Sequence, residues 1–346
     1  MMKIKKTILA KMEKPYAISS LKIDGEPYFL AASEERHGKC LLFHPPDFTR
    51  STVIWDSPGG CMTMSPLSSG NGSFIAIQKF YPIFDSDQST IVLAEPAEDL
   101  TEKWNMRVLS NLPFVHRCEV IRVAGVEYLV AAVLCGGKEY IEDWSLPGSV
   151  YVAKIPQNAG EELQLVPVMD GITKNHGMFV CEKEGRQVVY ISGQEGVFLL
   201  DYESSSRKWV HTRILDHGVS DLFLADIDGD GVDEMVTIEP FHGNRLVIYK
   251  VFNSSWKKVY ETEMDFGHVI WAGNTVLGPT VFMADRGGAK ALSVLQPKTL
   301  GTYDMRKMLI DTGVGAAQIS VSNQLGKTLL LSANHGIDEV ALYEIS

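Results

Sequence analysis

Histidines recur at two kinds of position along this chain, and imidazole can both bind metal ions and transfer protons. Four of the nine histidines stand just before a short apolar segment, and these are His116, His176, His217 and His268. Neutral imidazole is a common ligand of Zn, Mn, Fe or Ni, whereas protonated imidazoles repel one another when they converge. If the fold brings these four side chains together, we expect them to hold one divalent transition metal. The alternative is that each histidine only caps a strand by hydrogen bonding to the backbone.

A second group of polar residues follows the next apolar segment of each region. Its members include side chains that transfer protons or bind anions, and they are Tyr81, Glu195, His242, Arg286 and His335. Binding sites commonly assemble from loops of different sequence on one rigid scaffold. We therefore expect these residues to act on a substrate next to the metal.

An acidic segment with two glycines, DIDGDGVDE, runs from Asp226 to Glu234. Carboxylates stand at its positions 1, 3, 5 and 9, and a glycine at position 6 permits a sharp turn. Hard oxygen ligands on such a turn suit Ca²⁺. The alternative is an acidic turn that holds water and no metal. In either case we expect the segment to stabilise the fold rather than to catalyse.

These residues lie on a pattern of short strands that repeats about every fifty residues. Seven apolar, β-rich segments recur along the chain, at residues 28–33, 74–78, 128–134, 188–192, 234–239, 281–285 and 329–333. Another short strand and a glycine-containing turn precede each segment, and further strands follow it. Four antiparallel strands per repeat, without helical periodicity, are typical of a β-propeller blade.

The pattern predicts an all-β fold, with one domain over residues 1–346 that forms a seven-bladed β-propeller. The blades are expected at about residues 16–56, 60–110, 115–169, 175–215, 217–264, 267–310 and 314–346. The last repeat contains three strands, so a strand at about residues 3–10 is expected to complete blade seven and close the ring. Closure removes the unpaired edge that a linear array exposes. A pair of β-sandwiches is the alternative, but it predicts no uniform period.

A propeller would also place the polar residues relative to one another. The first strand of each blade lies innermost, so the four histidines that begin first strands are expected to point towards the central channel. In a hairpin, the start of one strand and the end of its partner lie at the same end. The second polar group is therefore expected on the same face as these histidines, and the acidic turn on the opposite face.

The acidic turn and the strand that follows it, residues 226–238, resemble the calcium loop of FG-GAP or VCBS-type propeller repeats. Asp24-Gly25 and Asn71-Gly72 resemble degenerate copies of this loop. The resemblance implies calcium ligands at Asp226, Asp228, Asp230 and Glu234, together with the Val232 carbonyl. Such repeats with histidines along the axis also resemble the propeller domain of aldos-2-ulose dehydratase and, more distantly, the propeller-fold carbohydrate lyases.

Composition excludes several other classes of function. The formal net charge of −11 opposes a broad phosphate-binding surface, so nucleic acid is not an expected partner. No apolar run approaches the roughly 18 residues that a membrane span needs, and the run at residues 7–10 is too short for a signal peptide. Five scattered cysteines without a CxxC pair predict free thiols in a cytoplasmic protein.

Two functions therefore remain in competition. The first is a metal-dependent carbohydrate lyase, dehydratase or isomerase that acts on a sugar or keto-sugar at the channel face. The second is a non-catalytic recognition module that binds a glycan or a protein with the same face. The substrate, the metal, the catalytic base and the oligomeric state stay open at this point.

Overall fold

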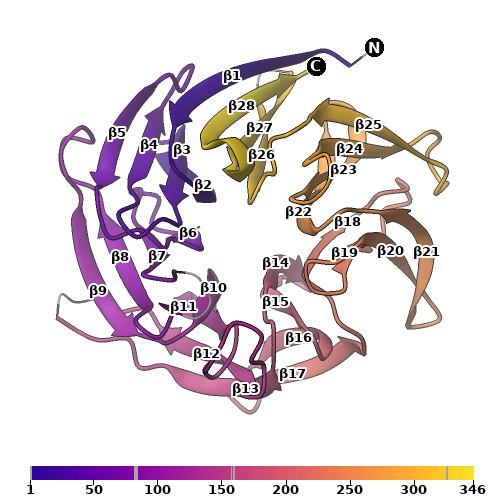
Figure 1. The fold of residues 1–346 in the computed structure, drawn as a ribbon. Coiled ribbons are helices and arrows are strands. Elements are labelled where there is room, and N and C mark those ends of the chain that lie inside the picture. Colours follow the sequence, from indigo (N-terminus) through magenta and orange to yellow (C-terminus); the bar gives the residue numbers. More distant parts are fainter. Residues whose placement is uncertain (1, 82–84, 157, 159, 325) are drawn as a thin grey trace.

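The computed structural model describes residues 2–81, 85–156, 158, 160–324 and 326–346. Its strands form seven antiparallel four-stranded sheets arranged in a ring (Figure 1). This confirms the all-β, seven-bladed propeller expected from the repeats. No helix within the described ranges is long and apolar enough to cross a membrane.

Each of the first six sheets uses four consecutive strands, counted from the innermost strand outwards. Blades one to three contain β2 (Pro15–Ile23), β3 (Glu26–Ser33), β4 (Cys40–His44) and β5 (Arg50–Trp55); β6 (Met64–Pro66), β7 (Phe74–Gln78), β8 (Thr90–Glu95) and β9 (Asn105–Asn111); and β10 (Val115–Val123), β11 (Val126–Val133), β12 (Gly148–Lys154) and β13 (Val166–Ile172). Blades four to six contain β14 (Gly177–Lys183), β15 (Arg186–Gly193), β16 (Gly196–Glu203) and β17 (Lys208–Leu215); β18 (Asp221–Ala225), β19 (Glu234–Glu239), β20 (Arg245–Phe252) and β21 (Ser255–Glu263); and β22 (Gly267–Thr275), β23 (Gly278–Asp285), β24 (Leu292–Pro297) and β25 (Met305–Asp311).

The seventh blade closes the ring with strands from both ends of the chain. It contains β26 (Ile319–Gln324), β27 (Lys327–Asn334), the 3-10 helix η2 (His335–Ile337), β28 (Glu339–Ile345) and, outermost, β1 (Ile4–Lys11). The pairing of β1 with β28 runs from Ile4 opposite Ile345 to Lys11 opposite Glu339, and the two termini lie close together in Figure 1. The predicted closure is therefore confirmed.

Second strands read as continuous apolar runs because both of their faces pack against neighbouring blades. In β7, Ile75 and Ile77 pack into one hydrophobic cluster, whereas Phe74 and Ala76 pack into another. All five residues of β7 are buried. The apolar runs that marked the repeats in the sequence are thus the contacts that hold adjacent blades together.

The inner hairpins of blades one, three and four turn on residue pairs in the left-handed conformation. Asp24 and Gly25 have φ angles of 51° and 83°, and the pair at Ala124 and Gly125 repeats this with 49° and 82°. Two successive positive φ angles are typical of the type I′ turn, whose twist matches that of the strands it joins. The glycines of these turns therefore permit the short connection between the two inner strands.

Candidate functional site

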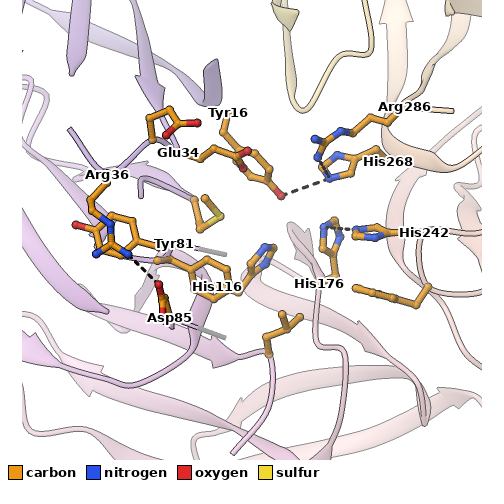
Figure 2. A pocket seen from close by; sticks show the side chains of 15 residues that line it. Tyr16, Glu34, Arg36, Tyr81, Asp85, His116, His176, His242, His268 and Arg286 are labelled. Atoms are coloured by element: carbon orange, nitrogen blue, oxygen red, sulfur yellow. Dashed lines mark hydrogen bonds and ion pairs between the residues drawn. The ribbon is translucent and has the colours of Figure 1, made fainter. Parts of the chain in front are cut away.

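A cavity of about 450 Å³ opens at one end of the central channel, where the inner strands begin. Its lining includes His116, His176, His242 and His268, which approach one another from four blades (Figure 2). Two further polar residues at its wall, Tyr16 and Arg286, point towards the imidazoles in the same view. Figure 2 also shows Glu34, Arg36, Tyr81 and Asp85 around the other side of this axial pocket.

One position of the inner strand supplies most of these side chains. The seven inner hairpins share a run of equivalent strand pairs, and this position directly precedes the first of those pairs. Its occupants are Tyr16, Thr63, His116, His176, Ser220, His268 and Gln318. At Tyr16, His116 and His268 the pairing skips this residue, which is the pattern of a β-bulge. A bulge redirects a side chain out of the regular alternation. The inner strands thus aim this position at the axial pocket.

This position could have been identified in the sequence from its distance to the hairpin glycine. Tyr16, His116 and His176 each stand nine residues before the turn glycine, at Gly25, Gly125 and Gly185. In blade five the residue nine positions before Gly229 is Ser220, whereas His217 stands twelve positions before it. Tyr16 was not predicted because its position is marked by this spacing and not by a histidine.

The structure corrects the predicted ligand set at His217. This residue precedes β18 by four positions, so its side chain does not reach the axial pocket. Its Nε2 lies 3.2 Å from Glu239 Oε1 and 3.1 Å from the Tyr249 hydroxyl, and 42% of the side chain is exposed. His217 is therefore not part of the candidate metal site.

His242 takes the place that was expected for His217. It belongs to the loop between β19 and β20, and its φ of 46° is left-handed, a strained conformation for a residue with a side chain. The backbone N–H of His242 donates to Ser220 Oγ over 3.2 Å. Because Ser220 occupies the inner position of this blade, it holds the loop that delivers the imidazole.

Three imidazoles converge closely enough to share one ion. Ligand nitrogens of His176, His242 and His268 all lie within 4.8 Å of one another. Nε2 of His176 is 3.4 Å from Nε2 of His242, and the His242 and His268 rings are stacked with centroids 5.1 Å apart. The His116 ring lies beside His176, with centroids 4.8 Å apart.

The surroundings keep these imidazoles neutral. Burial, reinforced by the neighbouring cations and imidazoles, lowers the pKa of His116, His176 and His268 well below the ordinary value. Burial and the guanidinium of Arg286 lower the pKa of His242 to about 3. A neutral imidazole keeps the lone pair that a metal requires.

Hydrogen bonding defines the tautomer at His268. Its Nδ1 is 2.9 Å from the carbonyl oxygen of Ala317, which can only accept, so Nδ1 carries the proton. Nε2 therefore presents its lone pair to the pocket. Metal-ligating histidines are commonly oriented in this way by a backbone carbonyl. Nδ1 of His176 is buried with no hydrogen-bond partner among the described residues, so the other two imidazoles are held by ring packing instead.

Arg286, predicted as a catalytic residue, does line the axial pocket. Its Nη1 lies 3.3 Å from His268 Nε2, and its Nη2 lies 3.0 Å from Nδ1 of His335. His335 belongs to η2, and its Nε2 lies 2.5 Å from Glu34 Oε1. Since the carboxylate accepts from Nε2, Nδ1 is the nitrogen that accepts from Arg286. A chain from Glu34 through His335 to Arg286 thus adjoins the imidazoles.

Tyr81 also lines the axial pocket, on the side away from the imidazoles. The Arg36 guanidinium lies 4.1 Å from the centre of its ring and forms an ion pair of 2.9 Å with Asp85. Burial raises the pKa of the Tyr81 hydroxyl. Tyr81 is thus placed to contact a bound molecule.

Glu195 is a second correction, because it lies outside the axial pocket. Its carboxylate accepts hydrogen bonds of 2.7 Å from both the backbone N–H and the hydroxyl of Thr173. These bonds tie the turn between β15 and β16 to the segment after β13. Glu195 therefore has a structural role at the rim.

The channel beneath the imidazoles contains a guanidinium and two carboxyl groups. Arg117 donates to the carbonyl oxygens of His176 over 2.6 Å and Met62 over 3.2 Å. Burial raises the pKa of Glu119 to about 7 and that of Asp221 to about 6, against the opposing influence of Arg117. Ser65 Oγ donates to Glu119 over 2.8 Å.

The acidic turn lies between β18 and β19, at the end of the hairpin away from Ser220, so the predicted opposite faces are observed. Its centre is filled by a side chain from β20. Lys250 Nζ lies 2.5 Å from Asp228, 2.6 Å from Asp230 and 3.0 Å from Glu234.

The other donors around this turn also come from the chain itself. The Tyr303 hydroxyl donates to Asp228 and Glu234 over 2.9 Å, and backbone N–H groups of the turn donate to Asp226. Although burial opposes it, hydrogen bonding to the three carboxylates raises the pKa of Lys250 above its ordinary value. Asp226, Asp228 and Glu234 still offer oxygens within reach of one ion, and calcium at this turn stays a prediction.

Comparison with known proteins identifies the fold. No protein-family model and no curated protein matches the chain. Among solved structures, the β-propeller domain of Cps50 (Swd1) from Myceliophteria thermophila is similar at 10% identity and a TM-score of 0.60, covering 99% of this chain and 100% of that chain. A 6-phosphogluconolactonase-like protein from Bacteroides fragilis is similar at 13% identity and a TM-score of 0.57, covering 92% and 87%. A luciferin-regenerating enzyme is similar at 10% identity and a TM-score of 0.51, covering 100% and 95%.

Proposed function

We propose that this chain is a metal-dependent carbohydrate lyase, dehydratase or isomerase whose site is the axial pocket. The observation that carries the proposal is the convergence of three neutral imidazoles, His176, His242 and His268, with ligand nitrogens within 4.8 Å of one another. They fit a divalent transition metal because each is neutral and none has to be deprotonated first, and an ion would replace Arg286 as the partner of the His268 Nε2 lone pair. Such an ion, when bound, would polarise a substrate carbonyl and acidify the neighbouring C–H.

The remaining residues of the axial pocket supply proton transfer and binding. Burial raises the pKa of Tyr16, so its hydroxyl stays protonated at neutral pH and can donate to a leaving oxygen. This hydroxyl lies 3.5 Å from His268 Nε2, at the edge of the imidazole cluster. His116, which is neutral, is the candidate for accepting a proton, Tyr81 is a second hydroxyl that can donate one, and Arg286 is a candidate for binding an anionic group.

A polyhydroxylated substrate fits the size and lining of this cavity. A volume of about 450 Å³ lies within the usual range of small-molecule sites. Phe80, Tyr81 and Phe241 contribute aromatic surface, which can stack on a sugar ring, and Asp85 can accept hydrogen bonds from hydroxyl groups. The unpaired state of all five cysteines favours a reducing compartment such as the cytoplasm. The proposed kinship with FG-GAP repeats, and the proposed calcium, rest on the acidic turn.

Metal content tests the ligand set directly. We expect purified protein to carry about one divalent transition ion per chain, and Co²⁺ substitution to give visible absorption bands. His176→Ala, His242→Ala and His268→Ala should each lose the ion, whereas His217→Ala, a histidine outside the axial pocket, should keep it. Circular dichroism checks that each variant remains folded. Retention of the ion by folded His242→Ala and His268→Ala would overturn this ligand set.

Activity is tested by incubating the protein with keto-sugars and uronides and following unsaturated products by absorbance. We expect product formation to stop after chelation and to return with the metal. If folded protein binds no metal and converts none of these compounds, yet retains a glycan, the axial face is a recognition module and the enzymatic proposal is wrong.

A further inference from the structure

We propose that the axial pocket selects sugar acids, and that Arg286 binds the substrate carboxylate. The inference rests on the proposed carbohydrate function and names its substrate class. It starts from an imbalance of charge. No carboxylate of the described residues lies within 4.0 Å of the Arg286 guanidinium, whose side-chain hydrogen bonds go to His268 and His335.

Arg286 is partly buried and has no direct carboxylate partner among the described residues, since Glu34 reaches it only through His335. Partial burial of a cation without a direct partner is unfavourable, and an anionic ligand at this place relieves that cost. Arg117, beneath the imidazoles, is also directed to carbonyl oxygens and adds positive potential from below. Arg36 differs, because Asp85 already pairs with it.

Asp85, an acidic residue of the axial pocket, lies apart from Arg286, whereas Glu34 reaches Arg286 only through His335. Figure 2 shows Arg286 beside His268 and His242, whereas Arg36 and Asp85 occupy the far side beyond Tyr81. A sugar acid matches this division. Its carboxylate would meet Arg286 next to the proposed metal, and its hydroxyl groups would face the carboxylates on the other side, which accept hydrogen bonds.

Two residues orient the guanidinium for this role. Glu34 accepts from His335 Nε2 over 2.5 Å, which leaves His335 Nδ1 to accept from Arg286 Nη2 over 3.0 Å. Both contacts act through Arg286 and not on the substrate, so Glu34 and His335 are positioning residues. The planar guanidinium retains further N–H groups, and such groups match a carboxylate with two parallel hydrogen bonds.

The same geometry favours a carboxylate over a phosphate. Only one guanidinium reaches this wall, because the contacts of Arg117 hold it against two backbone carbonyls. A phosphate monoester carries close to two negative charges, and the single guanidinium of Arg286 compensates only part of them.

Isothermal titration calorimetry with matched sugars tests the proposal. D-galacturonate and D-galactose differ by a carboxylate in place of a hydroxymethyl group, and D-galactose 6-phosphate adds a phosphate instead. We expect D-galacturonate to bind at least about tenfold more tightly than either of the others, in both metal-free and metal-loaded protein. Arg286→Gln should remove this preference and Arg286→Lys should keep part of it. Arg306→Gln, an exposed arginine on β25 of the same blade, is the control and should keep all of it.

The positioning residues are tested by a pair of substitutions. Glu34→Ala should weaken binding of D-galacturonate without changing that of D-galactose, and Glu34→Gln should restore most of the loss because its carbonyl still accepts from His335. Equal affinity for acid and neutral sugar, tighter binding of the phosphate, or a preference that survives Arg286→Gln would each overturn the inference. A protein that binds galacturonate through Arg286 but holds no metal would uphold this inference, and the enzymatic proposal would fail. A protein that catalyses elimination from a neutral keto-sugar, with no effect of Arg286→Gln, would uphold the enzymatic proposal, and this inference would fail.

Discussion

At the scale of the residue, the axial pocket depends on groups whose charge the fold has altered. The imidazoles of His176, His242 and His268 are neutral because burial and neighbouring cations oppose their protonation. Glu119 follows His116 by three residues on β10, and its pKa changes in the opposite sense, since burial raises the pKa of its carboxyl group to about 7. Both effects reflect the cost of placing charge where water is scarce.

Glu119 therefore makes the stability of the protein depend on pH. In the unfolded chain its carboxyl group releases its proton near its ordinary pKa of 4.5, and in the fold it does so near 7. Between these values the folded state binds one more proton than the unfolded state. The contribution of Glu119 to the free energy of unfolding thus falls as pH rises, by at most about 1.4 kcal/mol per pH unit.

Glu119→Gln should remove this contribution, since the amide keeps an acceptor for Ser65 and does not titrate. We expect the free energy of unfolding of the variant, relative to that of the wild type, to be higher at pH 8 than at pH 5. Urea unfolding at both pH values measures this difference. Glu98→Gln, at an exposed glutamate, is the control and should follow the wild type. Parallel pH dependence of the wild type and Glu119→Gln would contradict the assignment.

At the scale of the element, the hairpin between β18 and β19 shows how a neighbouring strand completes a turn. The carboxylates of Asp228, Asp230 and Glu234 converge, as the sequence indicated, but Lys250 from β20 supplies a cation at their centre. Lys250 and Glu234 are buried, with 11% and 0% of their side chains exposed. Lys250 thus places a positive charge of the protein itself among the carboxylates that the sequence assigned to calcium, and calcium there stays a prediction.

Lys250→Met should destabilise the protein by about 3 kcal/mol, because it leaves buried carboxylates without a cation. We expect calcium to restore much of this loss in the variant and to raise the melting temperature of the wild type only slightly. Thermal melts with CaCl₂ and with EDTA measure both effects. Lys258→Met, at an exposed lysine of β21 that pairs with Glu261 of the same strand, is the control. If calcium stabilises the wild type as much as the variant, calcium is the resident ion and Lys250 does not replace it.

The inner strands illustrate which part of the site was predictable from the sequence. His176 and His268 were placed correctly at the axis because each begins an inner strand. His217 was misplaced because three additional residues separate it from the equivalent position. His242 was expected on the same face but not among the imidazoles, since a loop conformation with positive φ decides where its ring points.

At the scale of the whole molecule, the ring is held closed by the pairing of β1 with β28. Ion pairs reinforce this contact, with Lys5 bound to Glu344 and Lys6 bound to both Glu339 and Asp311. Asp311 belongs to β25 of the adjacent blade, so Lys6 also joins blades six and seven. The pairing of β1 with β28 therefore helps to hold the seven blades around the central channel.

Deletion of residues 3–11 should open the ring and expose the backbone groups of β28. We expect the shortened chain to lose its cooperative melt and to associate, as measured by calorimetry and size-exclusion chromatography. A synthetic peptide of residues 3–11 should restore the melt, and a peptide with the same composition in scrambled order should not. A shortened chain that melts like the intact protein would show that closure by β1 is dispensable.

The sequence by itself determined the seven blades, their inner hairpins and the strand that closes the ring. Apolar runs and turn glycines are encoded by neighbouring residues, so their pattern survives without knowledge of long-range contacts. The same local information located the acidic turn and two of the three converging imidazoles.

Only the tertiary structure decided which side chains share the axial pocket and which lysine pairs with the acidic turn. Ring closure brings Tyr16 within 3.5 Å of His268 across 252 positions of sequence, and Glu34 within 2.5 Å of His335 across 301. Lys250 likewise reaches the turn from a different strand. These contacts depend on strand register, bulges and loop conformation together, and a shift of one residue in any of them would turn the side chain away.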